Sequence, residues 1–189
     1  MPYVACALIV VQLLLVLVSW IWSAAMPDSG VRSMLSGEGI RWFLGHSAEM
    51  LATPLLVWLL LLAAAIGCMV RSGLLKIHRS FRASRARIIT LLFLVAYIGI
   101  VLLLTVAPHA ILLSASGTLW PSPFSASLVP VVAFGLLSAA VLYGMVAGIF
   151  QTLEDVYDAL LYGLRLAAPY LLFYILLAQL YFSLLFIFG

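Results

Sequence analysis

The sequence predicts an all-α, polytopic membrane protein with about five transmembrane helices plus short interfacial amphipathic helices. Of its 189 residues, 67% are hydrophobic and only 8% are charged, and the mean hydropathy is +1.29. A chain of this composition cannot cover its apolar surface by folding in water. Its apolar residues also gather in five segments, each long enough to cross a bilayer as a helix of about 20 residues. We therefore expect a single transmembrane domain over residues 1–189, with spans at residues 4–25, 49–70, 88–107, 127–150 and 166–188.

The first span, residues 4–25, differs from a cleavable signal peptide. No Lys or Arg precedes it, and its apolar stretch is longer than the usual apolar region of a secretory signal. We expect this segment to stay in the protein as a transmembrane helix.

The segment between the first and second spans, residues 34–50 (MLSGEGIRWFLGHSAEM), is unusually polar for this chain. Ser36 can cap a short helix whose positively polarised first turn contains Glu38. The apolar residues on one face of this helix are Ile40, Phe43 and Leu44. Trp42 suits the lipid headgroup zone. The pattern favours a structural helix on the membrane surface, with a ligand-binding loop as the alternative.

The connection between the second and third spans sets the orientation in the membrane. It holds six of the nine Lys and Arg residues: Arg71, Lys76, Arg79, Arg82, Arg85 and Arg87. Because short cytoplasmic loops are enriched in Lys and Arg, we expect this connection to be cytoplasmic. Alternation across five spans then places the N-terminus in the cytoplasm and the C-terminus on the other side.

The same connection supplies candidate lipid contacts. The cations expected to meet lipid phosphate on the inner leaflet are Lys76, Arg79, Arg82, Arg85 and Arg87. An ordinary positive-inside anchor and a specific site for anionic lipid or a partner both fit this pattern. The net charge of +3 does not indicate nucleic acid as a partner, because the cations lie beside apolar segments.

The fourth span contains Ala140, Gly144 and Gly148 at intervals of four residues. Small residues repeated in this way let a neighbouring helix approach closely, as in G-x-x-x-G packing. We expect these three residues to form a helix-packing face. The pattern leaves open whether the neighbour belongs to the same chain or to a second subunit.

Residues 151–165 follow this span and predict an amphipathic helix at the membrane surface. Thr152 is the expected N-cap, with Asp155 three residues later near the positive end of the helix dipole. Pro169 is expected to bend the chain between this helix and the last span.

No residue pattern indicates an enzyme or a cofactor site. The three histidines, His46, His78 and His109, fall in three different connections, and the cysteines Cys6 and Cys68 lie far apart. The sequence therefore offers no nucleophile–base pair, no paired carboxylates and no metal-ligand cluster. We assign no catalytic, cofactor-binding or metal-binding residue.

Two stretches carry a family resemblance. In the first, LSGEGIRW at residues 35–42 precedes a membrane helix that ends in RSGL at residues 71–74. The second is residues 117–179, in which VLYGMVAGIFQTLEDV holds the Tyr143, Gly144 and Gly148 pattern and an acidic segment. Both resemble the p-aminobenzoyl-glutamate transporter (AbgT) family. Members of that family are longer, and the re-entrant hairpins of their transport core have no counterpart between Leu74 and Arg87.

The resemblance implies a short family member that lacks much of the transport core, so it transfers no substrate-binding or ion-binding residue. We expect a multi-pass protein of the bacterial inner membrane, in which the basic connection makes the N-terminus cytoplasmic and the C-terminus periplasmic. We expect a transport-associated module that works as part of an oligomer or a larger complex, through self-association or other membrane subunits. A non-transporting accessory or scaffold subunit is the alternative.

Overall fold

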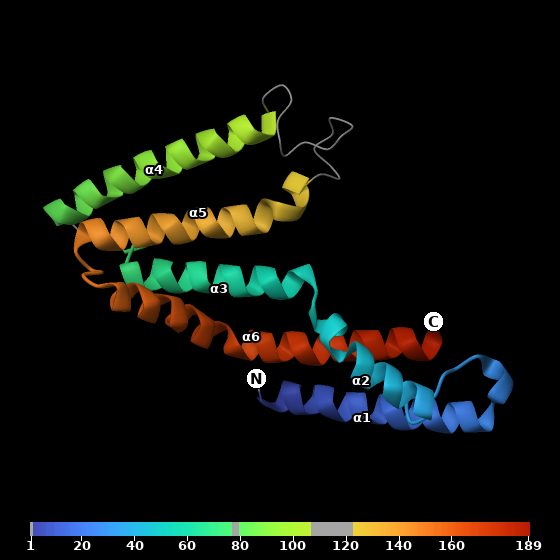
Figure 1. The fold of residues 1–189 in the computed structure, drawn as a ribbon. Coiled ribbons are helices and arrows are strands. Elements are labelled where there is room, and N and C mark those ends of the chain that lie inside the picture. Colours follow the sequence, from blue (N-terminus) through green and yellow to red (C-terminus); the bar gives the residue numbers. More distant parts are fainter. Residues whose placement is uncertain (1, 77–79, 107–122) are drawn as a thin grey trace. The chain divides into compact units, whose positions relative to one another are not determined.

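A computed structural model of the protein describes residues 2–76, 80–106 and 123–189, with side chains described from residue 127 in the last range, and these ranges contain helices and connections but no strand. The helices are α1 (Pro2–Ala25), η1 (Pro27–Ser29), α2 (Gly37–Leu51), α3 (Pro54–Ser72), α4 (Phe81–Val106), α5 (Pro123–Ala147) and α6 (Leu153–Phe188) (Figure 1). Five of them, α1, α3, α4, α5 and α6, are long and apolar enough to cross a membrane. The predicted fold class is confirmed. Three residues singled out in the sequence, His78, Arg79 and His109, lie outside the described ranges.

The chain forms two compact units. The terminal unit comprises residues 1–57 and 168–189, and the central unit comprises residues 58–167. Helix α6 contributes its second part to the terminal unit and its first part to the central unit.

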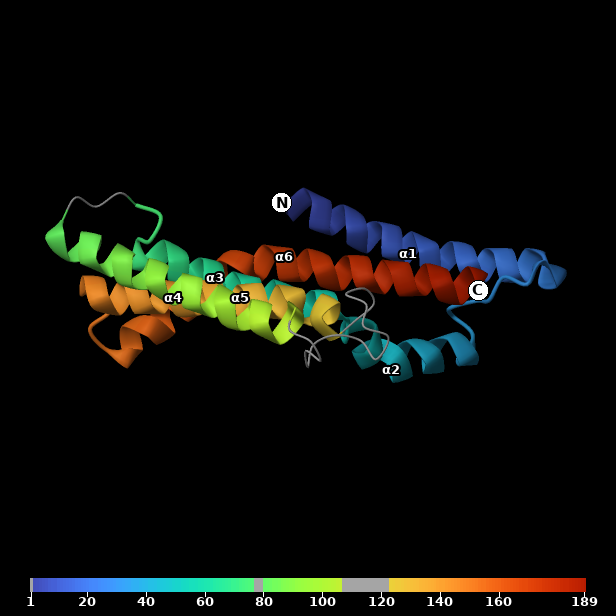
Figure 2. The ribbon, with the colours of Figure 1, turned by 90° about the horizontal axis from the view of Figure 1, so that it is seen from above.

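The terminal unit packs α1, α2 and the second part of α6 together (Figure 2). Its buried cluster consists of Met34, Phe186 and Ile187, surrounded by Leu15, Val16, Val31, Trp42 and Phe43. Two hydrogen bonds join segments that are distant in sequence: Gln12 Nε2 donates to Ser183 Oγ (2.8 Å), and the Arg32 amide donates to the Ile187 carbonyl (3.1 Å). Both tie the last turns of α6 to the N-terminal part of the chain.

In the central unit, α4 and α5 lie side by side (Figure 1). The Tyr97 hydroxyl of α4 donates to the Val131 carbonyl of α5 (2.8 Å), and Gly135 leaves the space that the Tyr97 ring occupies. A buried cluster of Cys68, Ala140, Phe150 and Ala159 then joins α3, α5 and the first part of α6.

The start of α2 follows the predicted capping pattern. The Gly39 amide donates to Ser36 Oγ (3.0 Å), and Glu38 lies in the first turn. The second span, however, begins at Pro54 rather than at residue 49, because α2 continues to Leu51 as a separate helix. Pro54 has no amide hydrogen and disfavours helical geometry at the residue before it, so the two helices are separated there.

Helix α6 has 36 residues and is about 54 Å long at 1.5 Å per residue. A bilayer core is only about 30 Å thick, so a steeply crossing α6 extends well beyond it. Its predicted start is confirmed: Asp155 Oδ2 accepts from the Gln151 and Thr152 amides (2.8 and 2.9 Å), and the Asp155 amide donates to Thr152 Oγ1 (3.2 Å). The helix continues through Pro169. The bend expected at this proline, where the two units join, stays a prediction.

Candidate functional site

The small-residue stripe predicted on the fourth span lies in the central unit and is only partly helical. Ala140 is fully buried in the cluster with Cys68 and Phe150. Gly144 faces Phe150, since a Cβ at Gly144 would lie less than 3.0 Å from three ring atoms of Phe150. In this unit the space at Gly144 is thus filled by a residue that follows its own helix.

Gly148 does not belong to the predicted helix face. It lies after the last residue of α5 with φ +76°, a left-handed conformation in which glycine carries no steric penalty. The Ile149 and Phe150 amides donate back to the Gly144 carbonyl (2.8 and 3.0 Å), so the turn satisfies a carbonyl at the helix end. The expectation that Gly148 continues the helical stripe is therefore wrong. A glycine four residues after another small residue can either continue a packing face or end the helix as its C-terminal cap, and Gly148 ends the helix.

A close helix approach in the central unit lies instead between α3 and α6, at Gly67 and Gly163. A Cβ at Gly163 would lie less than 3.0 Å from the Ala63 carbonyl, and one at Gly67 would lie less than 3.0 Å from the Gly163 backbone. The two backbones touch because neither residue has a side chain. A signal was present in the sequence: Ala63 and Ala159 each precede one of these glycines by four residues, which is the small-x-x-x-small pattern.

The described cations of the basic connection lie on exposed positions. Lys76 follows α3, whereas Arg82, Arg85 and Arg87 belong to the first turns of α4, in which Ala83 and Ala86 are buried. The sequence placed the start of this span at residue 88, so the cations extend the transmembrane helix itself. Contact between these side chains and lipid phosphate stays a prediction.

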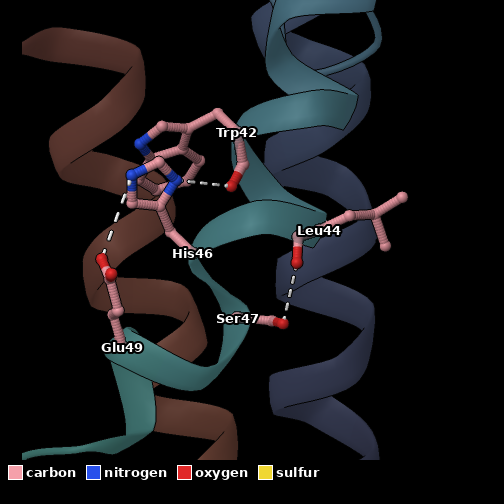
Figure 3. Close-up of polar contacts among 5 residues, drawn as sticks. All are labelled: Trp42, Leu44, His46, Ser47 and Glu49. Atoms are coloured by element: carbon pink, nitrogen blue, oxygen red, sulfur yellow. Dashed lines mark hydrogen bonds and ion pairs between the residues drawn. The ribbon is translucent and has the colours of Figure 1, made fainter.

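The polar side chains of α2 make local contacts (Figure 3). His46 Nδ1 donates to the Trp42 carbonyl (3.0 Å), and its Nε2 lies 4.0 Å from Glu49 Oε2. The Trp42 ring stacks on Phe186 of α6, with ring centroids 4.4 Å apart. Because the side chains of His46 and Glu49 are 51% and 78% exposed, their contact is a weak surface pair. This geometry fits a structural surface helix.

The break between α2 and α3 has a side-chain partner in the terminal unit. The Tyr174 hydroxyl donates to the Leu51 carbonyl (3.0 Å) and lies 2.5 Å from Thr53 Oγ1. Backbone groups freed by a helix break need such partners wherever lipid rather than water surrounds them. Sequence reasoning missed this contact, which joins residues more than 120 positions apart.

Ionisable side chains are confined to the ends of the described spans. Helices α1 and α5 contain no Asp, Glu, Lys, Arg or His, α4 has none after Arg87, and α6 has none after Arg165. The polar groups within the spans are neutral. Among them, the Tyr143 hydroxyl and Thr90 Oγ1 are buried and have no hydrogen-bond partner in the part of the chain that the structure describes.

Comparison with known proteins gives one match. Residues 82–185 match the model of the AbgT putative transporter family, which is more than half of the chain. The matched range covers α5 and nearly all of α4 and α6. It contains the resemblance noted at residues 117–179, whereas residues 35–75 lie outside it. Neither the curated proteins nor the solved structures gave a match.

Proposed function

Because the chain belongs to the AbgT transporter family, we propose that it is a transport-associated module of the bacterial inner membrane that works only within an oligomer or a larger complex. Its family and its five membrane-crossing helices make it a transporter-related, multi-pass membrane protein. The dependence on assembly, the bacterial inner membrane and the orientation of the termini are the proposed parts.

The observation that carries the proposal is the absence of ionisable side chains from the middle of the described spans. Transport pathways for charged substrates and coupling ions usually expose acidic, basic or strongly polar groups near the bilayer midplane. Between their charged ends, the described spans offer only neutral polar groups, such as Gln12, Thr90 and Tyr143. The described spans of one copy therefore lack the charged side chains that usually line a transport pathway. A transport pathway would then require further subunits.

The orientation rests on the basic connection. Arg71 in the last turn of α3, Lys76 after it and the cations in the first turns of α4 support a cytoplasmic location for this side. On that side, Lys76, Arg82, Arg85 and Arg87 meet the phosphates of the inner leaflet, each contact being worth about 1 kcal/mol.

An uptake assay tests the proposal. The assembly is extracted in mild detergent, part of it is dissociated to monomer, and both fractions are reconstituted into liposomes with p-aminobenzoyl-glutamate outside. We expect uptake from the intact assembly and none from liposomes that hold at most one copy of the chain. Uptake at the same rate per chain from single copies would refute the proposal.

The alternative, a non-transporting accessory or scaffold subunit, is favoured by one feature of the structure. The backbone contact at Gly67 and Gly163 and the apolar cluster around Cys68 pack the described helices of the central unit together. In the same assay, an intact assembly that retains other membrane subunits but shows no uptake would support this alternative.

A further inference from the structure

The central unit has a partly open hollow at the end of α3, and the proposed function uses its cations only for the orientation and for general lipid contact. Its volume is about 430 Å³. Its lining includes the cations Arg71 and Lys76, the carboxylate of Asp155, and the side chains of Ile149, Phe150 and Tyr162. The hollow thus combines two cations with a surface that can cover hydrocarbon.

Neither cation at this hollow is neutralised by a close ion pair among the described residues, although the charge of Arg71 acts on the nearby Asp155. No carboxylate oxygen among the described residues lies within 4.0 Å of a nitrogen of Arg71 or Lys76. Asp155 is already used for the start of α6, since its Oδ2 accepts from the Gln151 and Thr152 amides. Counting Arg71, Lys76 and Asp155, the lining carries a net charge of about +1 at neutral pH.

Arg71 is also held in place. Its guanidinium carbon lies 5.7 Å from the centroid of the Tyr162 ring, a cation–π arrangement that orients the planar group. A third cation is close, because the Arg82 guanidinium lies 3.8 Å from where a Cβ on Gly148 would be, next to Ile149. An oriented guanidinium with an ammonium nearby is suited to bind phosphate, the former through paired hydrogen bonds and the latter as a point charge.

We propose that this hollow binds a phosphate group through Arg71 and Lys76, with Tyr162 holding the guanidinium. The phosphate comes from the headgroup of an anionic phospholipid or from free phosphate. The lining residues Ile149, Phe150 and Tyr162 favour the lipid over free phosphate, because their apolar side chains can cover its glycerol and first acyl carbons. The site is distinct from the diffuse lipid contacts of the α4 cations, and it does not depend on whether the chain transports a solute.

Binding to the purified full-length chain in detergent tests this site. Short-chain phosphatidylglycerol, short-chain phosphatidylcholine and inorganic phosphate are titrated separately, and binding is measured by native mass spectrometry or calorimetry. We expect phosphatidylglycerol to bind, and Arg71→Gln and Lys76→Gln each to weaken it about fivefold, which corresponds to about 1 kcal/mol per cation. Arg71→Lys keeps the charge but loses the planar group that stacks on Tyr162, so it should weaken phosphatidylglycerol binding less than Arg71→Gln does.

Arg165→Gln is the matched control, because Arg165 is an exposed cation of the same unit that does not line the hollow. Binding of inorganic phosphate alone, with the same dependence on Arg71 and Lys76, would identify free phosphate as the ligand. The proposal is overturned if neither phosphatidylglycerol nor inorganic phosphate binds, or if phosphatidylcholine binds as well as phosphatidylglycerol. It is also overturned if Arg165→Gln weakens binding as much as Arg71→Gln and Lys76→Gln do. Lys76 lies outside the helices, so Lys76→Gln keeps the test decisive even if Arg71→Gln fails to fold.

Discussion

Replacing Gly163 by alanine should force α3 and α6 apart in the central unit. The added Cβ would lie less than 3.0 Å from the Ala63 carbonyl oxygen and from the backbone of Gly67. These are backbone atoms of another helix, so no side-chain rotation can relieve the overlap. Overpacking of this kind costs about 1–3 kcal/mol, and the better helix propensity of alanine offsets about 1 kcal/mol of it. We expect a net loss of up to about 2 kcal/mol, which corresponds to a fall of up to about 8 °C in the unfolding midpoint.

Cys68 provides the assay for Gly163→Ala. Its side chain is fully buried, and it follows Gly67 in α3. Its thiol therefore becomes accessible to thiol reagents when α3 and α6 separate at Gly67 and Gly163. The exposed Cys6 is first replaced by serine, and thiol labelling is then followed against temperature in detergent. Gly99→Ala is the control, because a Cβ there meets nothing within 4 Å. If Gly163→Ala unfolds at the same temperature as Gly99→Ala, the proposed backbone contact is wrong.

Three further predictions concern the helix ends and the topology. Gly148→Ala should lower the free energy of unfolding by about 1–2 kcal/mol in the same thiol assay, because alanine is strained at φ +76°. Gly148→Asn should lower it less. An unchanged unfolding midpoint for Gly148→Ala would contradict the left-handed turn. Tyr174→Phe should lower the free energy of unfolding by about 0.6–1.7 kcal/mol, because it loses the hydrogen bond to the Leu51 carbonyl. Thr53→Val leaves that bond intact and should lower the free energy of unfolding less. A larger loss for Thr53→Val would refute the role given to Tyr174. In intact cells, with both native cysteines replaced, a cysteine at Ser29 should react with an impermeant thiol reagent and one at Ser80 should not, and the opposite labelling would invert the orientation.

Local chemistry made the helix starts predictable from the sequence. The Ser36 cap of α2 and the Thr152–Asp155 pair of α6 both involve hydrogen bonds between residues three apart. Such contacts depend on backbone geometry within one turn, so residue type and spacing determine them. The five spans were predictable for a similar reason, since length and hydropathy alone identify a membrane helix.

Contacts between helices were harder to predict, because an apolar residue in a membrane protein faces lipid as readily as it faces protein. Ile40, Phe43 and Leu44 line one hollow beside α1, as their spacing suggests, yet Ile40 and Leu44 remain exposed. The packing of Trp42 on Phe186 joins two segments that no local rule connects. Hydrophobic periodicity therefore identified the faces of these helices but not their partners.

The small-residue patterns show the same limit. Ala140, Gly144 and Gly148 formed the most regular stripe in the sequence, but Gly148 ends its helix and Gly144 accommodates Phe150. The shorter patterns that end at Gly67 and Gly163 mark the actual backbone contact. A single pair of small residues four apart is common in membrane helices, so only the tertiary structure distinguishes a contact from an incidental repeat.

The mass of the chain after extraction from its native membrane in mild detergent tests the central claim most directly. One chain has a mass of 20.5 kDa. The account predicts that native mass spectrometry will find it mainly in a species of at least twice this mass, made of further copies or other membrane subunits. A single species at 20.5 kDa plus bound lipid, with Cys68 still protected from thiol reagents, would contradict the claim that the chain works only within an assembly.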